Sequence, residues 1–217
     1  MSAKNILTHF ENIDTEEKAY WLGFLYADGY ISSNEDKIEL CLAEKDFHHL
    51  EKFKDFIGLP NKICYRAANK AYRYSFRSAS CKQNLIKQGC IPKKSLILQF
   101  PTEEQVPNYL LRHFLRGYFD GDGWFTNTES CFEAGFISSS AFIESFLEKI
   151  EDFIDVKIDS KIKDVHRENG AKRYSFYSKP DVTAFLDFLY LDSNIYLDRK
   201  YEHYLDFKMN GSKYHKT

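Results

Sequence analysis

The chain has 217 residues, of which 43% are hydrophobic, and 30 Lys or Arg against 32 Asp or Glu give it a formal net charge of −2. This length fits one domain or two small ones with an ample core, and no apolar run is long enough to cross a membrane. The N-terminal MSAKNILTHFENIDTEEK lacks an apolar signal core, so we expect a cytoplasmic protein without membrane contact, and five cysteines with no C-x-x-C pair argue against disulfides and structural zinc.

The first predicted element is a helix. Asp14, with Glu17 three residues later, predicts its N-terminal cap, and the helix is expected to end near Asp28. Gly29 suits a left-handed residue directly after the last turn.

The remaining elements alternate between strands and helices. Residues 37–43 alternate apolar and polar side chains, which predicts a half-buried strand, and residues 47–57 form an amphipathic helix that stops at Gly58. Strands over 62–67 and 71–78 and a helix over 80–88 follow. In the second half we expect helices over 108–123, 140–151, 180–190 and 196–208, and strands over 131–138, 157–164 and 171–178.

The two halves are an internal repeat. WLGFLYADGYI (21–31) aligns with LRGYFDGDGWF (115–125) at an offset of 94, and the same offset places Glu39 opposite Glu133. RYSF at 73–76 returns at 173–176 with an offset of 100, so we assign about six extra residues to the hairpin DVHRENGAK, whose Asn-Gly pair indicates a turn. Two like units in one chain are expected to pack about a pseudo-twofold axis.

The repeated helix carries small residues at a spacing of four, Gly23 with Ala27 and Gly117 with Gly121. This strip lets two helices approach closely, which offsets the cost of glycine within a helix, about 1 kcal/mol each.

Asp28 and Asp122 follow the strips in the last helical turn, where the helix dipole disfavours a carboxylate. Carboxylate and carbonyl oxygens that converge there suit Mg²⁺ and phosphodiester hydrolysis. The alternative is that each Asp only caps a turn in an Asp-Gly pair.

Basic residues are concentrated in two zones. Residues 61–94 contain nine Lys or Arg and no Asp or Glu, and residues 157–179 contain seven Lys or Arg against three acids. Such segregation favours binding of a polyanion, although a solvated basic strand face would look the same.

WLGFLYADG and LRGYFDGDG resemble the two nonapeptide motifs of the LAGLIDADG homing endonucleases, in the single-chain, two-repeat form. The resemblance implies an α+β fold of two pseudo-twofold-related αββαββα-type repeats, residues 1–100 and 101–217. The motif helices would form the central interface, and curved antiparallel sheets would form a DNA-binding saddle.

The resemblance also implies roles for individual residues. Asp28 and Asp122 would be the metal ligands and catalytic acids, and the carbonyls of Ala27 and Gly121 would be secondary ligands. Basic residues late in each repeat would lie near the scissile phosphates, which nominates Lys94 (or Lys93) and Lys200 (or Arg199). The sixth motif position, Tyr26 in the first copy and Asp120 in the second, is not the usual ligand.

The DNA surface is expected on the basic strands and their hairpins, where Arg and Lys can contact phosphates or guanine. The candidates are Lys62, Arg66, Lys70, Arg73, Arg77, Lys161, Lys163, Arg167 and Arg173. The Phe residues of the RYSF repeats, Phe76 and Phe176, are expected in the core.

These observations predict a monomeric, site-specific endonuclease that makes a double-strand break in DNA with Mg²⁺ or another divalent cation such as Mn²⁺. Two alternatives stay open on the same scaffold: a maturase that binds intron RNA and assists splicing, and a non-catalytic DNA-binding regulator. Retention of both acids argues against the regulator and says little against the maturase.

Overall fold

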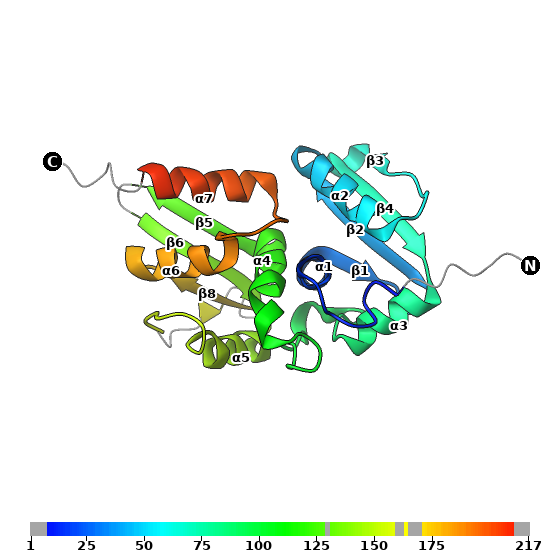
Figure 1. Ribbon diagram of the computed structural model, residues 1–217. Coiled ribbons are helices and arrows are strands. Elements are labelled where there is room, and N and C mark those ends of the chain that lie inside the picture. The colour runs from blue at the N-terminus through cyan, green and yellow to red at the C-terminus, as the bar shows by residue number, and fades with distance from the viewer. Residues whose placement is uncertain (1–7, 129–130, 159–162, 165–170, 211–217) are drawn as a thin grey trace, which may run out of the picture.

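The computed structural model describes residues 8–128, 131–158, 163–164 and 171–210, which form two similar halves that meet at a central pair of helices (Figure 1). The helices are α1 (Glu16–Asp28), α2 (Phe47–Ile57), α3 (Ala79–Lys87), α4 (Leu111–Asp122), α5 (Ser140–Ile150), α6 (Lys179–Tyr190) and α7 (Asp198–Asn210). The strands are β1 (Gly29–Ile31), β2 (Lys37–Ala43), β3 (Cys64–Arg66), β4 (Ala71–Arg77), β5 (Gly123–Thr128), β6 (Cys131–Ser138), β7 (Lys163–Asp164) and β8 (Lys172–Phe176).

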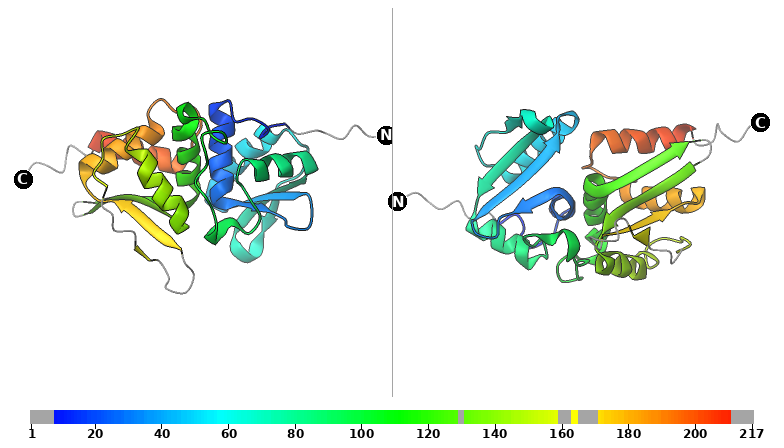
Figure 2. Two further views of the ribbon diagram at one scale, coloured as in Figure 1. Left: turned by 90° about the horizontal axis from the view of Figure 1, so that it is seen from below. Right: turned by 180° about the vertical axis from the view of Figure 1, so that it is seen from behind.

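Each half contains one antiparallel four-stranded sheet with the same topology. The strand orders are β1-β2-β4-β3 and β5-β6-β8-β7, so the αββαββα repeat is confirmed. The two sheets extend to the same side of the helix pair and form the two arms of a saddle (Figure 2).

The helix boundaries follow from local capping, with two corrections to the sequence prediction. The N-cap of α1 is Thr15, whose hydroxyl accepts from Lys18 N at 3.2 Å, so Asp14 is not the cap. Gly29 is extended, with φ −71° and ψ 138°, because the chain enters β1 directly. Gly58 does stop α2 in the left-handed region, at φ 70°.

Two strands were missing from the sequence prediction. Strands β1 and β5 begin at the glycine that directly follows each motif helix. At three residues, β1 is too short to show an alternating pattern, and its pairing with β2 defines it. These strands connect each motif helix directly to its sheet.

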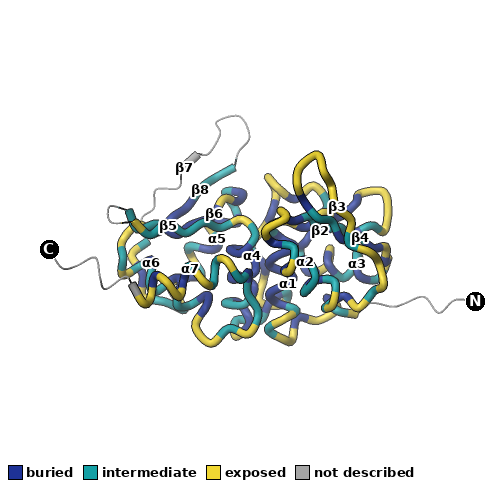
Figure 3. The backbone as a smooth tube through the Cα atoms, turned by 90° about the horizontal axis from the view of Figure 1, so that it is seen from above, coloured by how far each residue is buried: buried dark blue, intermediate teal, exposed yellow. Residues whose placement is uncertain are grey.

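Helices α1 and α4 pack backbone against backbone at the glycine strip. A Cβ atom at Gly23 would lie 1.9 Å from Phe114 O, and one at Gly117 would lie 1.9 Å from Tyr20 O. Further along, a Cβ at Gly121 would lie 2.4 Å from Ala27 Cβ. The predicted small-residue contact is therefore present along the whole interface, which is buried at the centre of the molecule (Figure 3).

Polar contacts also join the halves. Arg116 of α4 is completely buried, and its guanidinium donates to Glu16 Oε1 of α1 at 2.6 Å. It also donates to Leu189 O and Ile195 O, at 2.9 and 2.8 Å. Asn194 Nδ2 donates to the same glutamate, at 2.8 Å to Oε2. The motif helices are thus held by both packing and charge.

The inner faces of both sheets are aromatic. Tyr74 and Phe76 of β4, and Tyr174 and Phe176 of β8, are all at most 3% exposed. The RYSF repeats therefore contribute their aromatic rings to the core, as expected for the two Phe residues.

The strand register corrects the alignment of the two halves. Gly29 pairs with Leu40, whereas Gly123 pairs with Phe136, so the offset grows from 94 to 96 within the first hairpin. Leu40 pairs with Tyr74 and Phe136 with Tyr174, which brings the offset to 100. Two of the six extra residues therefore lie between β5 and β6 and four between β6 and β8, rather than all in DVHRENGAK. The structural counterpart of Glu39 is Gly135, not Glu133.

Within the described part of the chain, no helix combines the length and apolar character that a membrane span would need. The five cysteines are all free thiols.

Candidate active site and nucleic-acid interface

The two motif aspartates lie where the paired helices end. Asp28 is the last residue of α1, and Asp122 is the last residue of α4. Asp28 Oδ2 is 3.3 Å from the position that a Cβ would take at Gly121, so the first carboxylate reaches across to the end of the other helix. Both aspartates are exposed to solvent, which leaves them open to a ligand.

The surrounding protein disfavours charge on both carboxylates. Desolvation raises the pKa of Asp28 above its usual value. The pKa of Asp122 is raised to about 6, first by desolvation and then by the neighbouring charge of Asp28. Positive charges at Lys94 and Lys200 oppose both shifts. Two carboxylates that repel each other and retain solvent access are the expected arrangement for a cation site.

One lysine from each half contacts the chain directly after a motif aspartate. Lys94 Nζ donates to Gly29 O, and Lys200 Nζ donates to Gly123 O at 2.6 Å and to Phe119 O. Because Gly29 and Gly123 are equivalent in the repeat, the two lysines are equivalent as well. Burial lowers the pKa of Lys200 to about 8.

These contacts separate the nominated lysines from their neighbours in sequence. Arg199 Nε donates to Asp46 Oδ1 at 2.8 Å, so its charge is paired with the start of α2. Lys93 precedes the short 3-10 turn Lys94–Leu96 in a left-handed conformation, at φ 56°. Lys94 and Lys200, rather than Lys93 and Arg199, contact the backbone beside the aspartates.

The sixth motif position points away from the two aspartates in both copies. Asp120 is 1% exposed and accepts hydrogen bonds from two tyrosines and a backbone amide. Tyr26 is likewise buried, and its hydroxyl donates to Gln88 O at 2.5 Å. Neither residue lies at the open end of the helix pair.

Three arginines lie on the outer face of the N-terminal sheet, away from α2 and α3. Arg77 pairs with Lys37, Arg73 with Cys41, and Arg66 with Ala71, positions that alternate with the buried rings of Tyr74 and Phe76. Arg73 lies 3.6 Å from Glu39, and Arg77 lies 2.8 Å from Glu35.

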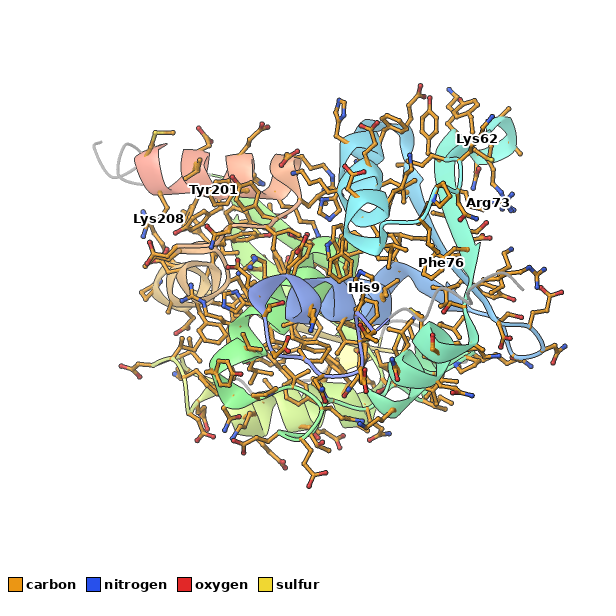
Figure 4. The ribbon with its side chains drawn as sticks, turned by 45° about the vertical axis from the view of Figure 1, so that its right-hand side comes forward. His9, Lys62, Arg73, Phe76, Tyr201 and Lys208 are labelled. Atoms are coloured by element: carbon orange, nitrogen blue, oxygen red, sulfur yellow. The ribbon has the colours of Figure 1, made fainter. Side chains whose placement is uncertain are left out.

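Further lysines extend this basic face at the β3–β4 arm. Lys62 and Lys70 are exposed, and within the described ranges neither forms an ion pair. Lys62 and Arg73 lie on the arm of the N-terminal half, whereas Tyr201 and Lys208 lie on α7 of the other half (Figure 4).

Arg173 occupies the equivalent place in the second sheet but is held differently. Its guanidinium pairs with Glu133 and stacks on the ring of Trp124, with Cζ 4.3 Å from the ring centroid. The backbone of Arg173 is paired with that of Ile137 on β6. Its side chain therefore passes over Gly135 to reach Glu133, which lies four residues from Ile137 on the same strand. Lys163 pairs with Arg173 through the backbone, while Lys161 and Arg167 lie outside the described residues.

Sequence reasoning missed both restraints on these arginines. The acid partner of Arg73 is Glu39 and that of Arg173 is Glu133, although the two glutamates are not equivalent in the repeat. The recurrence of a Glu in each second strand and of an Arg in each RYSF repeat was a signal for these pairs, but the sequence alone did not show which strands are neighbours in the sheet.

Among the described residues there is no group of three or more His, Cys, Asp or Glu side chains that could hold a metal ion. A cation at the helix ends would therefore have two carboxylate ligands, with carbonyls, water or a substrate completing its shell. Mg²⁺ is usually coordinated in this way in proteins, because it retains several waters and binds through one or two carboxylates plus substrate phosphate.

Comparison with known proteins gives the class of this fold. The family model of the LAGLIDADG-like domain matches residues 110–190, and no curated protein matches the chain at a significant level. The structure of the LAGLIDADG homing endonuclease I-GzeII in complex with its DNA target is similar, with a TM-score of 0.61, 14% identity and 92% of each chain covered. I-LtrWI, a LAGLIDADG homing endonuclease bound to target DNA, has a TM-score of 0.57 with 13% identity over 90% of each chain.

The N-terminal LAGLIDADG domain of DUF199/WhiA is also similar, with a TM-score of 0.53, 16% identity, and coverage of 91% of this chain and 94% of that chain. The chain thus shares the fold of these LAGLIDADG proteins over about nine-tenths of its length, and residues 110–190 match the model of the LAGLIDADG-like domain. Both motifs lie in one chain, so this is the single-chain, two-repeat form of that fold.

Proposed function

We propose that the protein is a site-specific DNA endonuclease that uses Mg²⁺, or another divalent cation such as Mn²⁺, to hydrolyse one phosphodiester in each strand. The observation that carries the proposal is the convergence of Asp28 and Asp122 at the open end of α1 and α4, with one equivalent lysine beside each. Because both halves lie in one chain, the protein would act as a monomer in the cytoplasm of its host.

The residues present fit a hard divalent cation. Asp28 and Asp122 offer carboxylate oxygens and are open to solvent, and desolvation raises both pKa values, with the charge of Asp28 adding to the shift of Asp122. The carbonyls of Ala27 and Gly121 belong to last turns, whose carbonyls lack partners within the helix. A cation held there would stabilise charge on the leaving oxygen and make water a stronger nucleophile.

The other residues bind and orient the substrate. Lys94 and Lys200 place a positive charge beside each aspartate, where a phosphate would be drawn to the carboxylate pair. Arg66, Arg73 and Arg173 line the outer faces of the sheets, whose saddle shape suits duplex DNA. Arg173, held by Glu133 and the ring of Trp124, is oriented for directional contacts to bases, and Lys62 is free to contact phosphate.

A second candidate is a nucleic-acid-binding protein that does not cut, such as an RNA-binding maturase or a regulator. The similarity to the N-terminal LAGLIDADG domain of DUF199/WhiA favours keeping this candidate, because that domain shares the fold and is not named as an endonuclease. Basic sheet faces would serve all these roles, so cleavage itself must decide between them.

The deciding experiment uses DNA that spans the insertion site of the genetic element encoding the protein, placed in a supercoiled plasmid. Wild-type protein should linearise the plasmid with Mg²⁺ or Mn²⁺ and leave it intact with EDTA. Asp28→Asn and Asp122→Asn should abolish cleavage while binding persists.

The control is Asp14→Asn, an exposed carboxylate just before the other end of α1, which should cut normally. Specific binding without magnesium-dependent cleavage by the wild type would favour the non-catalytic candidate. Normal cleavage by both motif variants would refute the assigned site.

A further inference from the structure

Asp120 occupies a buried node that touches both halves of the molecule. Its Oδ2 accepts from Tyr20 Oη of α1 at 2.7 Å and from Leu197 N at 2.7 Å, and its Oδ1 accepts from Tyr190 Oη of α6 at 2.5 Å. Tyr20 Oη also lies 2.9 Å from His49 Nε2 of α2. The carboxylate on α4 thus joins α1 to the segment 190–197, although the three are distant in sequence.

The node connects through the chain to Lys200, the lysine beside Asp122. Leu197 immediately precedes α7, and its carbonyl accepts from Lys200 N at 3.0 Å. Leu197, which Asp120 holds through its N–H, therefore starts with its carbonyl the turn that carries Lys200. The Lys200 ammonium in turn donates to Gly123 O at 2.6 Å, beside Asp122.

The first half contains an equivalent restraint built from different chemistry. Tyr26, at the same motif position as Asp120, donates through Oη to Gln88 O at 2.5 Å. Gly89 has φ +88°, and a Cβ there would lie 2.1 Å from Tyr26 Oη, so the turn is shaped around the hydroxyl. This turn leads into the segment that carries Lys94, whose ammonium donates to Gly29 O.

We infer that the sixth motif position holds the active-site lysine of its own half, with Asp120 positioning Lys200 and Tyr26 positioning Lys94. The inference deepens the proposed nuclease site and rests on that proposal. Neither residue touches the open end of the helix pair, so both position the lysines through the segments they hold, and the charge of Asp120 in addition opposes the lowering of the Lys200 pKa. Disturbing either one should slow the cutting of one DNA strand more than the other.

The experiment compares three variants on a duplex that the wild type cuts, with each strand carrying its own 5′ fluorophore. Asp120→Leu removes all three hydrogen bonds, while Tyr26→Phe removes one hydroxyl. Each should slow one strand by about tenfold or more, since small misplacements of a positioning group cost up to about a hundredfold. The two variants should slow opposite strands, so that nicked intermediates of opposite polarity accumulate.

Asp120→Asn is the conservative control. Its amide oxygen can accept from Leu197 N and Tyr20 Oη, and its NH₂ can donate to the Tyr190 hydroxyl, so the segment stays in place. It should cut both strands at a ratio within about threefold of the wild type. An even loss on both strands in Asp120→Leu and Tyr26→Phe would overturn the inference, because general destabilisation has no strand preference.

A second readout needs no nuclease activity and tests the lysines directly. Brief treatment with acetic anhydride, followed by peptide mass spectrometry, should acetylate Lys200 faster in Asp120→Leu than in Asp120→Asn, which lacks the same charge, and Lys94 faster in Tyr26→Phe than in the wild type. Exposed Lys62 should be unchanged in both. Unchanged acetylation of both active-site lysines, or equal gains at both in either variant, would overturn the inference. A wild type that cuts no DNA, yet shows the selective labelling, would refute the proposed function while supporting the positioning role.

Discussion

Gly23 of α1 and Gly117 of α4 occupy equivalent places, and each faces a backbone carbonyl of the opposite helix, where a Cβ would lie 1.9 Å away. In an isolated helix, Gly117→Ala would stabilise by about 1 kcal/mol. In this protein it should lower the free energy of unfolding by about 1–3 kcal/mol, because the helices must separate. Chemical denaturation measures this difference.

The control is an alanine substitution at an exposed helical position outside the interface, Gln83→Ala on α3. Its free energy of unfolding should stay within about 0.5 kcal/mol of the wild type. A stability of Gly117→Ala equal to or above that of the wild type would mean that the two helices do not meet as described.

His49 makes the fold sensitive to acid. It is 2% exposed, and burial lowers its pKa from 6.5 to about 3. The unfolded chain therefore binds more protons between these values, so the stability that neutral His49 contributes is present above pH 6.5 and is lost as the pH falls towards 3. Asp122, with its raised pKa, makes the fold more stable as the pH falls and so opposes the effect of His49. A variant that lacks His49 is needed to separate the two contributions.

His49→Gln can keep a hydrogen bond to Tyr20 but cannot titrate. Its unfolding free energy should fall less steeply than that of the wild type between pH 6.5 and 4. Urea titrations at several pH values measure the two slopes, and parallel slopes would contradict the buried neutral state of His49.

The motif carboxylates and the repeat architecture could be predicted from sequence because the small residues, the acid and the final glycine lie within nine consecutive residues that occur twice. Lys94 and Lys200 could be nominated but not separated from Lys93 and Arg199, since six further residues lie between the RYSF repeat and this lysine in the second copy. The pairing of Glu133 with Arg173 was hidden because the two residues lie on different strands, four positions apart in register, and no local pattern shows that β6 and β8 are neighbours.

The role of Asp120 was hidden because its partners are remote in the chain. Tyr20 is 100 residues away, Leu197 is 77 residues away, and Tyr190 is 70 residues away. Local patterns carry no information about such contacts, whereas they do place an acid at the end of a helix.

Lys62 should contribute to nucleic-acid binding through charge alone. It is exposed on the β3–β4 arm, and Lys62→Ala should reduce the magnitude of the salt slope of binding by about 1 if it contacts one phosphate. Lys208→Ala is the control, because that lysine lies on α7 and pairs with Asp187 at 2.7 Å. Fluorescence anisotropy at several salt concentrations measures both slopes, and equal slopes for the two variants would remove the arm from the binding surface.

Protons and cations should compete at the helix ends. Desolvation and the charge of Asp28 raise the pKa of Asp122 to about 6, so its proton is favoured in the folded state. The associated stability is present below pH 3.8 and is lost as the pH rises through 6, while affinity for Mn²⁺ should rise over the same range. Asp28→Asn removes the negative charge of Asp28, so the titration midpoint of Asp122 should move towards lower pH. The same substitution should also weaken binding of the cation, because it removes one carboxylate ligand. Carbon-13 NMR titration of the carboxyl groups measures that midpoint without any metal, and an unchanged value in Asp28→Asn would mean that the two aspartates do not interact.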